Sequence, residues 1–184
     1  MPIPNARQNN KRKRINLKIA LVILFAIFFG LLEAIVVIYV RQLFGSGDTL
    51  ISRRVTADDI ALTLGFIAFL KRSASTLITQ NQYILSLELW RELSTLIMLA
   101  ALSLIAGKTT KEKLACFLLV FGIWDIFYYV FLKIITGWPA SFLDPDVYFL
   151  IPVAWVGPVI APIIISAILI ILAIILLRKL PKKI

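Results

Sequence analysis

The residues of this chain that could do chemistry are ionisable and aromatic side chains inside or beside long apolar runs. A charge in hydrocarbon is costly, so an ionisable residue at that depth indicates a functional site. Glu88, Arg91 and Glu92 share one helical face, because residues three and four apart are neighbours on a helix. Asp125 and Tyr129 follow the same spacing in another run. The candidate site residues are Glu33, Glu88, Arg91, Glu92, Asp125, Tyr128, Tyr129, Lys133, Trp138, Asp144, Asp146 and Trp155.

The acids within the apolar runs outnumber the bases. The acids are Glu33, Glu88, Glu92 and Asp125, and the bases are Arg91 and Lys133. Either some of these acids are protonated in the low dielectric, or a bound cation or Arg41 neutralises the excess negative charge. Carboxylates beside a proline-broken segment are typical of sites that bind protons, Na⁺ or small solutes. The first hypothesis is therefore a non-catalytic, outward-opening polar site for an ion, a small ligand or a lipid.

Three other interpretations stay open. Glu33, Glu92 and Asp125 are candidate metal ligands, for an enzyme in which carboxylates hold Mg²⁺ or Mn²⁺ and basic side chains hold a lipid phosphate. The polar groove could instead receive another membrane subunit, which would make the protein an accessory subunit. The structural interpretation is a set of buried salt bridges, Glu33 or Glu92 with Arg91 and Asp125 with Lys133. No cofactor and no catalytic residue is assigned.

Composition excludes several classes of protein. Of the 184 residues 60% are hydrophobic, and the mean hydropathy of +0.93 indicates an integral membrane protein whose first partner is the lipid bilayer. The chain has no histidine and no nucleophile motif, which argues against triad and zinc hydrolases. Cys116 is the single cysteine, so the chain forms no internal disulfide. The net charge of +10 does not indicate a nucleic-acid partner, because the basic residues lie at the ends of apolar spans.

Four apolar segments predict an all-α membrane protein with a single domain over residues 17–177. Transmembrane helices are expected at about residues 17–40, 83–106, 114–136 and 147–177, with a short interfacial helix at about 57–72. The fourth segment is longer than one crossing needs, and its three prolines lie in its first half. These features predict a broken start, such as a half-helix, followed by a regular helix from about Val159.

The distribution of basic residues predicts the orientation in the membrane. Thirteen of the twenty Lys and Arg residues lie in the N-terminal part, the 107–113 loop and the C-terminal tail, against five in the 41–82 connection. This excess predicts that the basic flanking segments 1–16 and 178–184 are both cytoplasmic. With that orientation, the candidate site residues fall in the outer half of the membrane or in the outer loop.

Three stretches of the chain resemble a widespread, uncharacterised family of small bacterial four-helix inner-membrane proteins. They are GLLEAIVVIYVR (Gly30–Arg41), LELWRELSTLIML (Leu87–Leu99) and FGIWDIFYYVFLKIITGWPASFLDPDVYFLIPVAWVGP (Phe121–Pro158). Together they cover roughly half of the chain and include all of the candidate site residues. The resemblance implies a bacterial inner-membrane location and brings no assigned activity.

Overall fold

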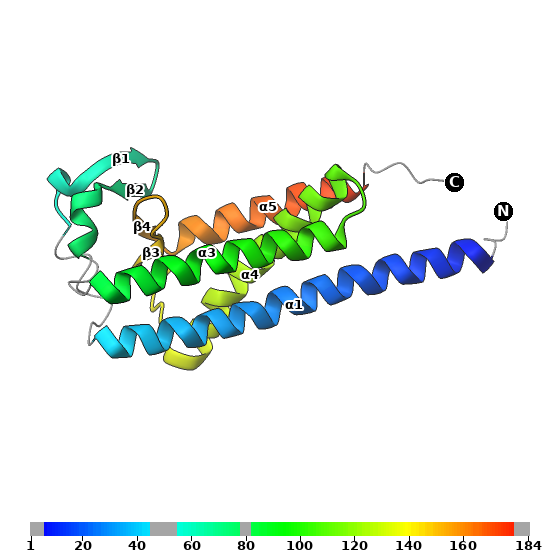
Figure 1. The fold of residues 1–184 in the computed structure, drawn as a ribbon, viewed down its shortest axis with the longest axis horizontal. Helices are drawn as coiled ribbons and strands as arrows, with labels where there is room; N and C mark the ends of the chain where they lie inside the picture. Colours follow the sequence, from blue (N-terminus) through cyan, green and yellow to red (C-terminus); the bar gives the residue numbers. More distant parts are fainter. Residues whose placement is uncertain (1–5, 45–54, 78–81, 179–184) are drawn as a thin grey trace.

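The computed structural model describes residues 6–44, 55–77 and 82–178, which contain four long helices packed in one bundle (Figure 1). They are α1 (Ala6–Phe44), α3 (Gln82–Ala106), α4 (Thr110–Thr136) and α5 (Ile160–Arg178). Each contains a stretch long and apolar enough to cross a bilayer, so the architecture is that of a multi-pass membrane protein. The start of α1 and the end of α5 lie at one end of the bundle, and a small sheet lies at the other (Figure 1).

The ends of the helices carry ordinary local signals. α1 begins at Ala6, so it includes most of the basic segment that the hydropathy pattern leaves outside the first crossing. Thr109 caps α4 by accepting the backbone N–H of Glu112 at 3.2 Å. Gly137 ends α4 with a φ of 78°, which a residue with a side chain rarely adopts. These caps define the lengths of the two helices that carry most of the candidate residues.

A small antiparallel sheet corrects the all-α prediction. Its strands are β1 (Ile60–Leu64), β2 (Ile67–Leu70), β3 (Pro145–Phe149) and β4 (Trp155–Pro158). They are ordered β1-β2-β4-β3, so two hairpins from distant parts of the chain join edge to edge. Ala68 lies opposite Val156, and Phe69 lies opposite Trp155.

The interfacial helix predicted over residues 57–72 is wrong. One helical turn, η1 (Ala57–Asp59), forms at the expected start, and another, η2 (Arg72–Leu77), follows the strands. Between them the chain is extended, and Gly65 reverses it with a φ of 59°, a conformation open to glycine. The strands persist because β4 supplies a hydrogen-bonding partner, and that partner lies far away in the sequence.

The fourth apolar segment, predicted as one broken helix over 147–177, divides near Pro158. Most of β3, a loop and β4 occupy its first part in place of the expected half-helix. α5 begins at Ile160, close to the predicted start of the regular helix. Pro162 lies in the first turn of α5, where a backbone N–H has no helical partner and proline costs little.

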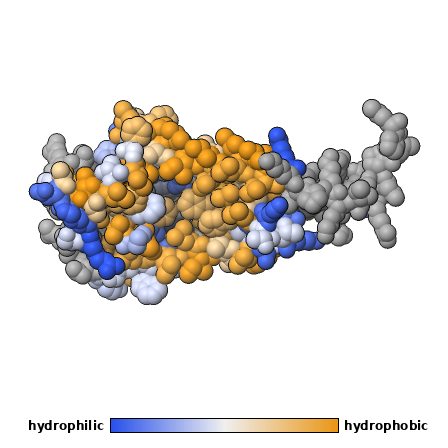
Figure 2. Space-filling model, turned by 90° about the horizontal axis from the view of Figure 1, so that it is seen from above, coloured by the Kyte–Doolittle hydropathy of each residue, from blue (hydrophilic) through white to orange (hydrophobic). Residues whose placement is uncertain are grey.

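α4 is the central helix and packs against α1, α3 and α5. Two glycines let the backbones approach: a Cβ on Gly30 of α1 would lie 2.8 Å from the Trp124 carbonyl oxygen, and one on Gly122 would lie 2.7 Å from the Ser166 carbonyl oxygen. Close backbone approach at small residues is a usual way of packing helices in membranes. Figure 2 shows that one face of the molecule is a largely apolar surface between hydrophilic groups near its two ends.

Candidate functional site

Arg91 of α3 joins two acids on two helices, in the half of the bundle nearer the sheet. Its Nη1 forms an ion pair with Oε1 of Glu33 on α1, and its Nε donates to Oε2 of Glu88 at 2.9 Å. Thr95, one turn further along α3, donates its hydroxyl to the other oxygen of Glu33 at 3.3 Å. The polar face predicted on the second apolar run therefore meets Glu33, which is only 6% exposed. The salt bridge between Glu33 and Arg91 that the structural interpretation requires is present.

Glu92 connects α3 to the loop between β3 and β4. Its two carboxylate oxygens both accept the backbone N–H of Leu150, at 3.0 and 2.9 Å, and its side chain is buried. Within the described part of the chain it forms no ion pair. Arg91, the preceding residue of α3, acts on Glu92 electrostatically without forming an ion pair with it. A buried carboxylate without an ion pair is costly unless a proton or a cation joins it.

Asp125 lies at the centre of α4 and is buried against α5. Its Oδ2 accepts the hydroxyl of Ser166 at 2.7 Å. The pairing of Asp125 with Lys133 expected under the structural interpretation is wrong. Lys133 donates instead to the carbonyl oxygens of Gly137 and Pro139, at 2.9 and 2.7 Å. Residues eight apart on a helix are separated by about 12 Å along its axis, and the free carbonyls after the helix end are nearer to the ammonium group.

Asp146 of β3 is held between two helices. Its Oδ1 accepts from Nη2 of Arg41 at 3.1 Å, and its Oδ2 accepts the hydroxyl of Tyr129 at 2.8 Å. The guanidinium of Arg41 also lies over the ring of Trp138, 4.1 Å from its centroid. We call the group around Arg91 (Glu33, Glu88, Arg91 and Thr95) the first cluster. The second cluster is Arg41 at the end of α1, Tyr129 of α4, Trp138 in the loop after α4, and Asp146 of β3.

Tyr128 lies between the two clusters. Charged groups of both clusters, Arg91, Arg41 and Asp146, lie near its phenol, as does Asp125. Its ring meets that of Tyr129 edge to face, with 4.8 Å between the centroids. Its hydroxyl makes no hydrogen bond with the residues that the structure describes. Tyr128 is therefore a neutral donor available beside both clusters.

Asp144 and Trp155 have other surroundings. Asp144 accepts two backbone N–H groups of the loop that follows α4, at 2.7 and 3.1 Å, so it orders that loop. Trp155 packs its ring against Phe69 of β2 and Phe149 of β3, with centroids 4.9 and 5.9 Å away. Its buried indole N–H has no hydrogen-bond partner among the described residues. Asp144 and Trp155 thus lie outside the two clusters, as do Lys133, Glu92, Asp125 and Tyr128.

The three candidate metal ligands are not brought together as a set. Glu33, Glu92 and Asp125 are engaged with a guanidinium, a backbone N–H and a serine hydroxyl, respectively. Across residues 6–44, 55–77 and 82–178, no group of three or more His, Cys, Asp or Glu side chains is placed to hold a metal ion. The geometry therefore gives no support to a site with several carboxylates on one divalent metal.

Outside the membrane-spanning helices, the pKa of Tyr148 in β3 is shifted by burial and by two of the buried carboxylates. Its hydroxyl donates to the carbonyl oxygen of Pro158 at 2.6 Å. Burial raises the pKa of the Tyr148 phenol, and the nearby carboxylates of Asp146 and Asp125 raise it further. Tyr148 is therefore a neutral hydrogen-bond donor at physiological pH.

Sequence reasoning missed Ser166 and gave Arg41 only a minor part. Ser166 is the one hydroxyl-bearing residue of α5, in a run that is otherwise aliphatic apart from Pro162 and the final arginine. That isolation was the available signal, because a lone hydroxyl in such a run suggests a polar partner on a neighbouring helix. Arg41 lies at the end of the first apolar run, where basic residues are common anyway, so its position carried little information.

The chain matches no protein-family model, and no curated protein or solved structure matches it significantly. The resemblance to small bacterial four-helix membrane proteins therefore stays a prediction from the three sequence stretches.

Proposed function

We propose that this is a multi-pass protein of a bacterial inner membrane that binds a proton or a small cation in the outer half of its helix bundle. Both termini are cytoplasmic in this proposal, as the distribution of Lys and Arg favours. The proposal includes membership of the four-helix family that the three sequence stretches resemble. The candidate binding groups are Glu92 of α3 and Asp125 of α4, two separate buried carboxylates that form no ion pair among the described residues.

The excess of carboxylates over basic groups carries the proposal. Five acids are buried or half-buried in the two clusters and beside them, and two arginines accompany them: Glu33, Glu88, Glu92, Asp125 and Asp146, with Arg41 and Arg91. Arg41 pairs with Asp146, while Arg91 is shared between two acids. These five acids therefore exceed the two arginines by three formal charges, and two of the acids, Glu92 and Asp125, form no ion pair with the described residues. In a low dielectric such charges are neutralised by protons or by a bound cation.

The state of the two arginines favours a cation over an anion. Arg41 is engaged with Asp146 and with the ring of Trp138, and Arg91 with Glu33 and Glu88. Neither guanidinium is left to bind a phosphate on its own. The enzyme hypothesis needs both a metal cluster and a phosphate-binding base, and the described geometry supports neither.

A purely structural network is the second candidate, because each buried acid already has a hydrogen-bond donor. Glu92 fastens the loop after β3 to α3, and Asp125 fastens α4 to α5. Under this alternative the acids are protonated or paired permanently, and they hold the sheet against the bundle without exchanging any ligand.

Thermal unfolding of the protein in lipid nanodiscs tests the proposal. A ligand that binds only the folded state raises its stability by RT ln(1 + [L]/Kd), about 2.7 kcal/mol when the ligand is at 100 times Kd. We expect at least one of Na⁺, K⁺, Mg²⁺, Ca²⁺ or a lowered pH to raise the unfolding midpoint, at an ionic strength kept constant with N-methylglucamine. The amide variants Asp125→Asn and Glu92→Gln keep an acceptor oxygen and should lose this dependence while remaining folded.

Infrared spectroscopy distinguishes the two ligand classes. A bound proton gives a carbonyl stretching band of a protonated carboxyl group, and Asp125→Asn or Glu92→Gln should remove its share of that band. A wild-type midpoint that no cation and no pH change moves, together with the absence of a titrating carboxyl band, would leave the structural network as the answer.

A further inference from the structure

The hairpin formed by β1 and β2 carries large apolar side chains on its outside. Leu62 and Leu64 of β1 are 53% and 59% exposed, and Phe66 in the turn is 78% exposed. From Ile60 to Leu70 the chain has no charged residue, whereas Asp59 and Lys71 flank it directly. An apolar hairpin tip between charged flanks is costly to leave in water.

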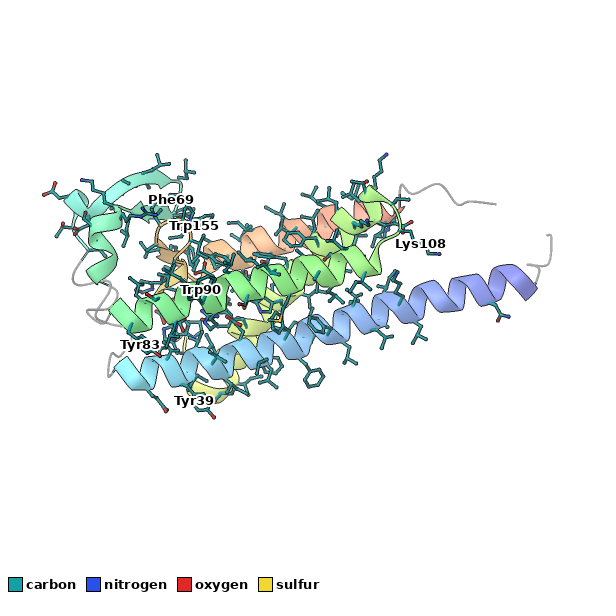
Figure 3. The ribbon with its side chains drawn as sticks, in the orientation of Figure 1. Tyr39, Phe69, Tyr83, Trp90, Lys108 and Trp155 are labelled. Atoms are coloured by element: carbon teal, nitrogen blue, oxygen red, sulfur yellow. The ribbon has the colours of Figure 1, made fainter. Side chains whose placement is uncertain are left out.

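The hairpin is placed where a membrane surface would meet it. It lies to one side of the sheet-bearing end of the bundle, and its turn points along the bundle toward the end with the termini (Figure 1). Phe69 of β2 and Trp155 of β4 lie at about the same level along the bundle as Trp90 (Figure 3). Trp90 is 68% exposed on α3, in the position typical of the aromatic belt at a membrane interface.

The hairpin is tied firmly to the bundle. β2 pairs with β4, and a Cβ on Gly157 of β4 would overlap the carbonyl oxygen of Phe66. A chain of ring contacts continues inward from Phe69 through Trp155, Phe149 and Phe121, with centroids 4.9, 5.9 and 6.2 Å apart in turn. The exposed tip therefore keeps a set height relative to the lipid-facing surface of the helices.

We propose that the tip of this hairpin, Leu62, Leu64 and Phe66, inserts into the outer leaflet at the boundary between head groups and acyl chains. The backbone sets the depth, because β1 is an edge strand whose outward N–H and C=O groups need water or head groups as partners. The side chains enter the acyl region and the strand stays in the interface. The occupant of this surface is lipid, and the inference does not depend on what the carboxylates bind.

Site-specific quenching in liposomes tests the insertion. Cys116→Ala removes the native thiol, and Phe66→Cys or Leu64→Cys then accepts a fluorescent label at an exposed position. The matched control is Asp58→Cys, in η1 at the other end of β1, whose side chain is exposed. We expect iodide in the water to quench the label at positions 66 and 64 several-fold less than at position 58. Phospholipids with a nitroxide near the head group should quench positions 66 and 64 strongly and position 58 weakly.

Two outcomes would overturn the inference. Equal iodide quenching at positions 58, 64 and 66 would show that the tip stands in water. Protection of positions 64 and 66 from both iodide and nitroxide lipid would show that protein, such as a second copy of the chain, covers the tip. Using two labelled positions keeps the test valid if one substitution prevents folding, which circular dichroism and size-exclusion elution report for each variant.

Discussion

Replacing Arg91 by methionine tests the most densely connected part of the structure. The substitution keeps an unbranched apolar stem and removes the guanidinium that Glu33 and Glu88 share. Removing one partner of a buried ion pair typically costs about 3–5 kcal/mol, because the other charge is left unpaired. The Arg91 side chain is 25% exposed, so water still reaches it and we take the lower end, about 3 kcal/mol.

The measurement is the unfolding midpoint of the protein in lipid nanodiscs. For a soluble domain of this size, 1 kcal/mol corresponds to roughly 2–4 °C, so Arg91→Met should lower the midpoint by roughly 6–12 °C. Lys111→Met is the matched control, because it removes a positive charge from an exposed site at the opposite end of the bundle. That control should stay within about 0.5 kcal/mol of the wild type, as surface substitutions usually do.

A double-mutant cycle with Glu33→Gln isolates the pair. Glutamine keeps the shape of Glu33 and an acceptor for the Thr95 hydroxyl, and it removes the charge that Glu33 would otherwise leave unpaired when Arg91 is absent. The two changes together should therefore cost at least about 1 kcal/mol less than the sum of the single changes, within the range usual for contacting residues. The reasoning is refuted if Arg91→Met has the same unfolding midpoint as the Lys111→Met control. It is also refuted if the free-energy changes of the two single substitutions add up to that of the double variant within about 0.5 kcal/mol.

Three further predictions concern packing, pH and topology. Gly122→Ala should lower the free energy of unfolding by about 1–3 kcal/mol, because the added Cβ would meet the Ser166 carbonyl oxygen of α5. Enlarging a lipid-facing alanine by one methyl group should leave the free energy of unfolding unchanged. The hydrogen bonds that Asp59 accepts from the backbone N–H and the hydroxyl of Thr56 lower its pKa below the ordinary 3.8. The protection of the hairpin amides against hydrogen exchange should therefore be present at neutral pH and lost as the pH falls through the lowered pKa. The Asp59→Asn variant should show no such pH-dependent step in hydrogen exchange. In a Cys116→Ala background, Ser141→Cys should react with a membrane-impermeant thiol reagent added outside intact cells and Lys108→Cys should not, and the reverse would overturn the proposed orientation.

Hydropathy and local capping signals account for most of the bundle. Each of the four membrane-spanning helices can be predicted from the apolar residues of its own segment, because a lipid-facing helix satisfies its own backbone hydrogen bonds. The end of α4 lies at the predicted residue 136, because Gly137 acts on a backbone group within its own turn. Its start was predicted at residue 114 and lies four residues earlier, at Thr110, after the cap at Thr109. The face formed by Glu88, Arg91 and Glu92 follows from helical spacing alone.

The sheet could not be read in this way. The residues of β1 and β2 form an apolar run that suits a short helix as well as a hairpin. Thr56 and the acids Asp58 and Asp59, which precede the run, are residues typical of a helix start. The pairing of Phe69 with Trp155 decides between helix and hairpin, and hydrogen bonds between residues so far apart leave no periodicity in either segment. The same limit applies to Lys133, whose partners are carbonyls exposed only by the way α4 ends.

The sequence by itself determined that this chain forms apolar helices with an excess of carboxylates in one half, because residue type and helical spacing are local properties. Only the tertiary structure decided which acid meets which partner: Glu33 with Arg91, Glu92 with the N–H of Leu150, and Asp125 with Ser166. Those pairings depend on how neighbouring helices are rotated and how the loop between β3 and β4 returns to the bundle. Contacts across helices are set by the packing of whole surfaces, including the close approaches at Gly30 and Gly122.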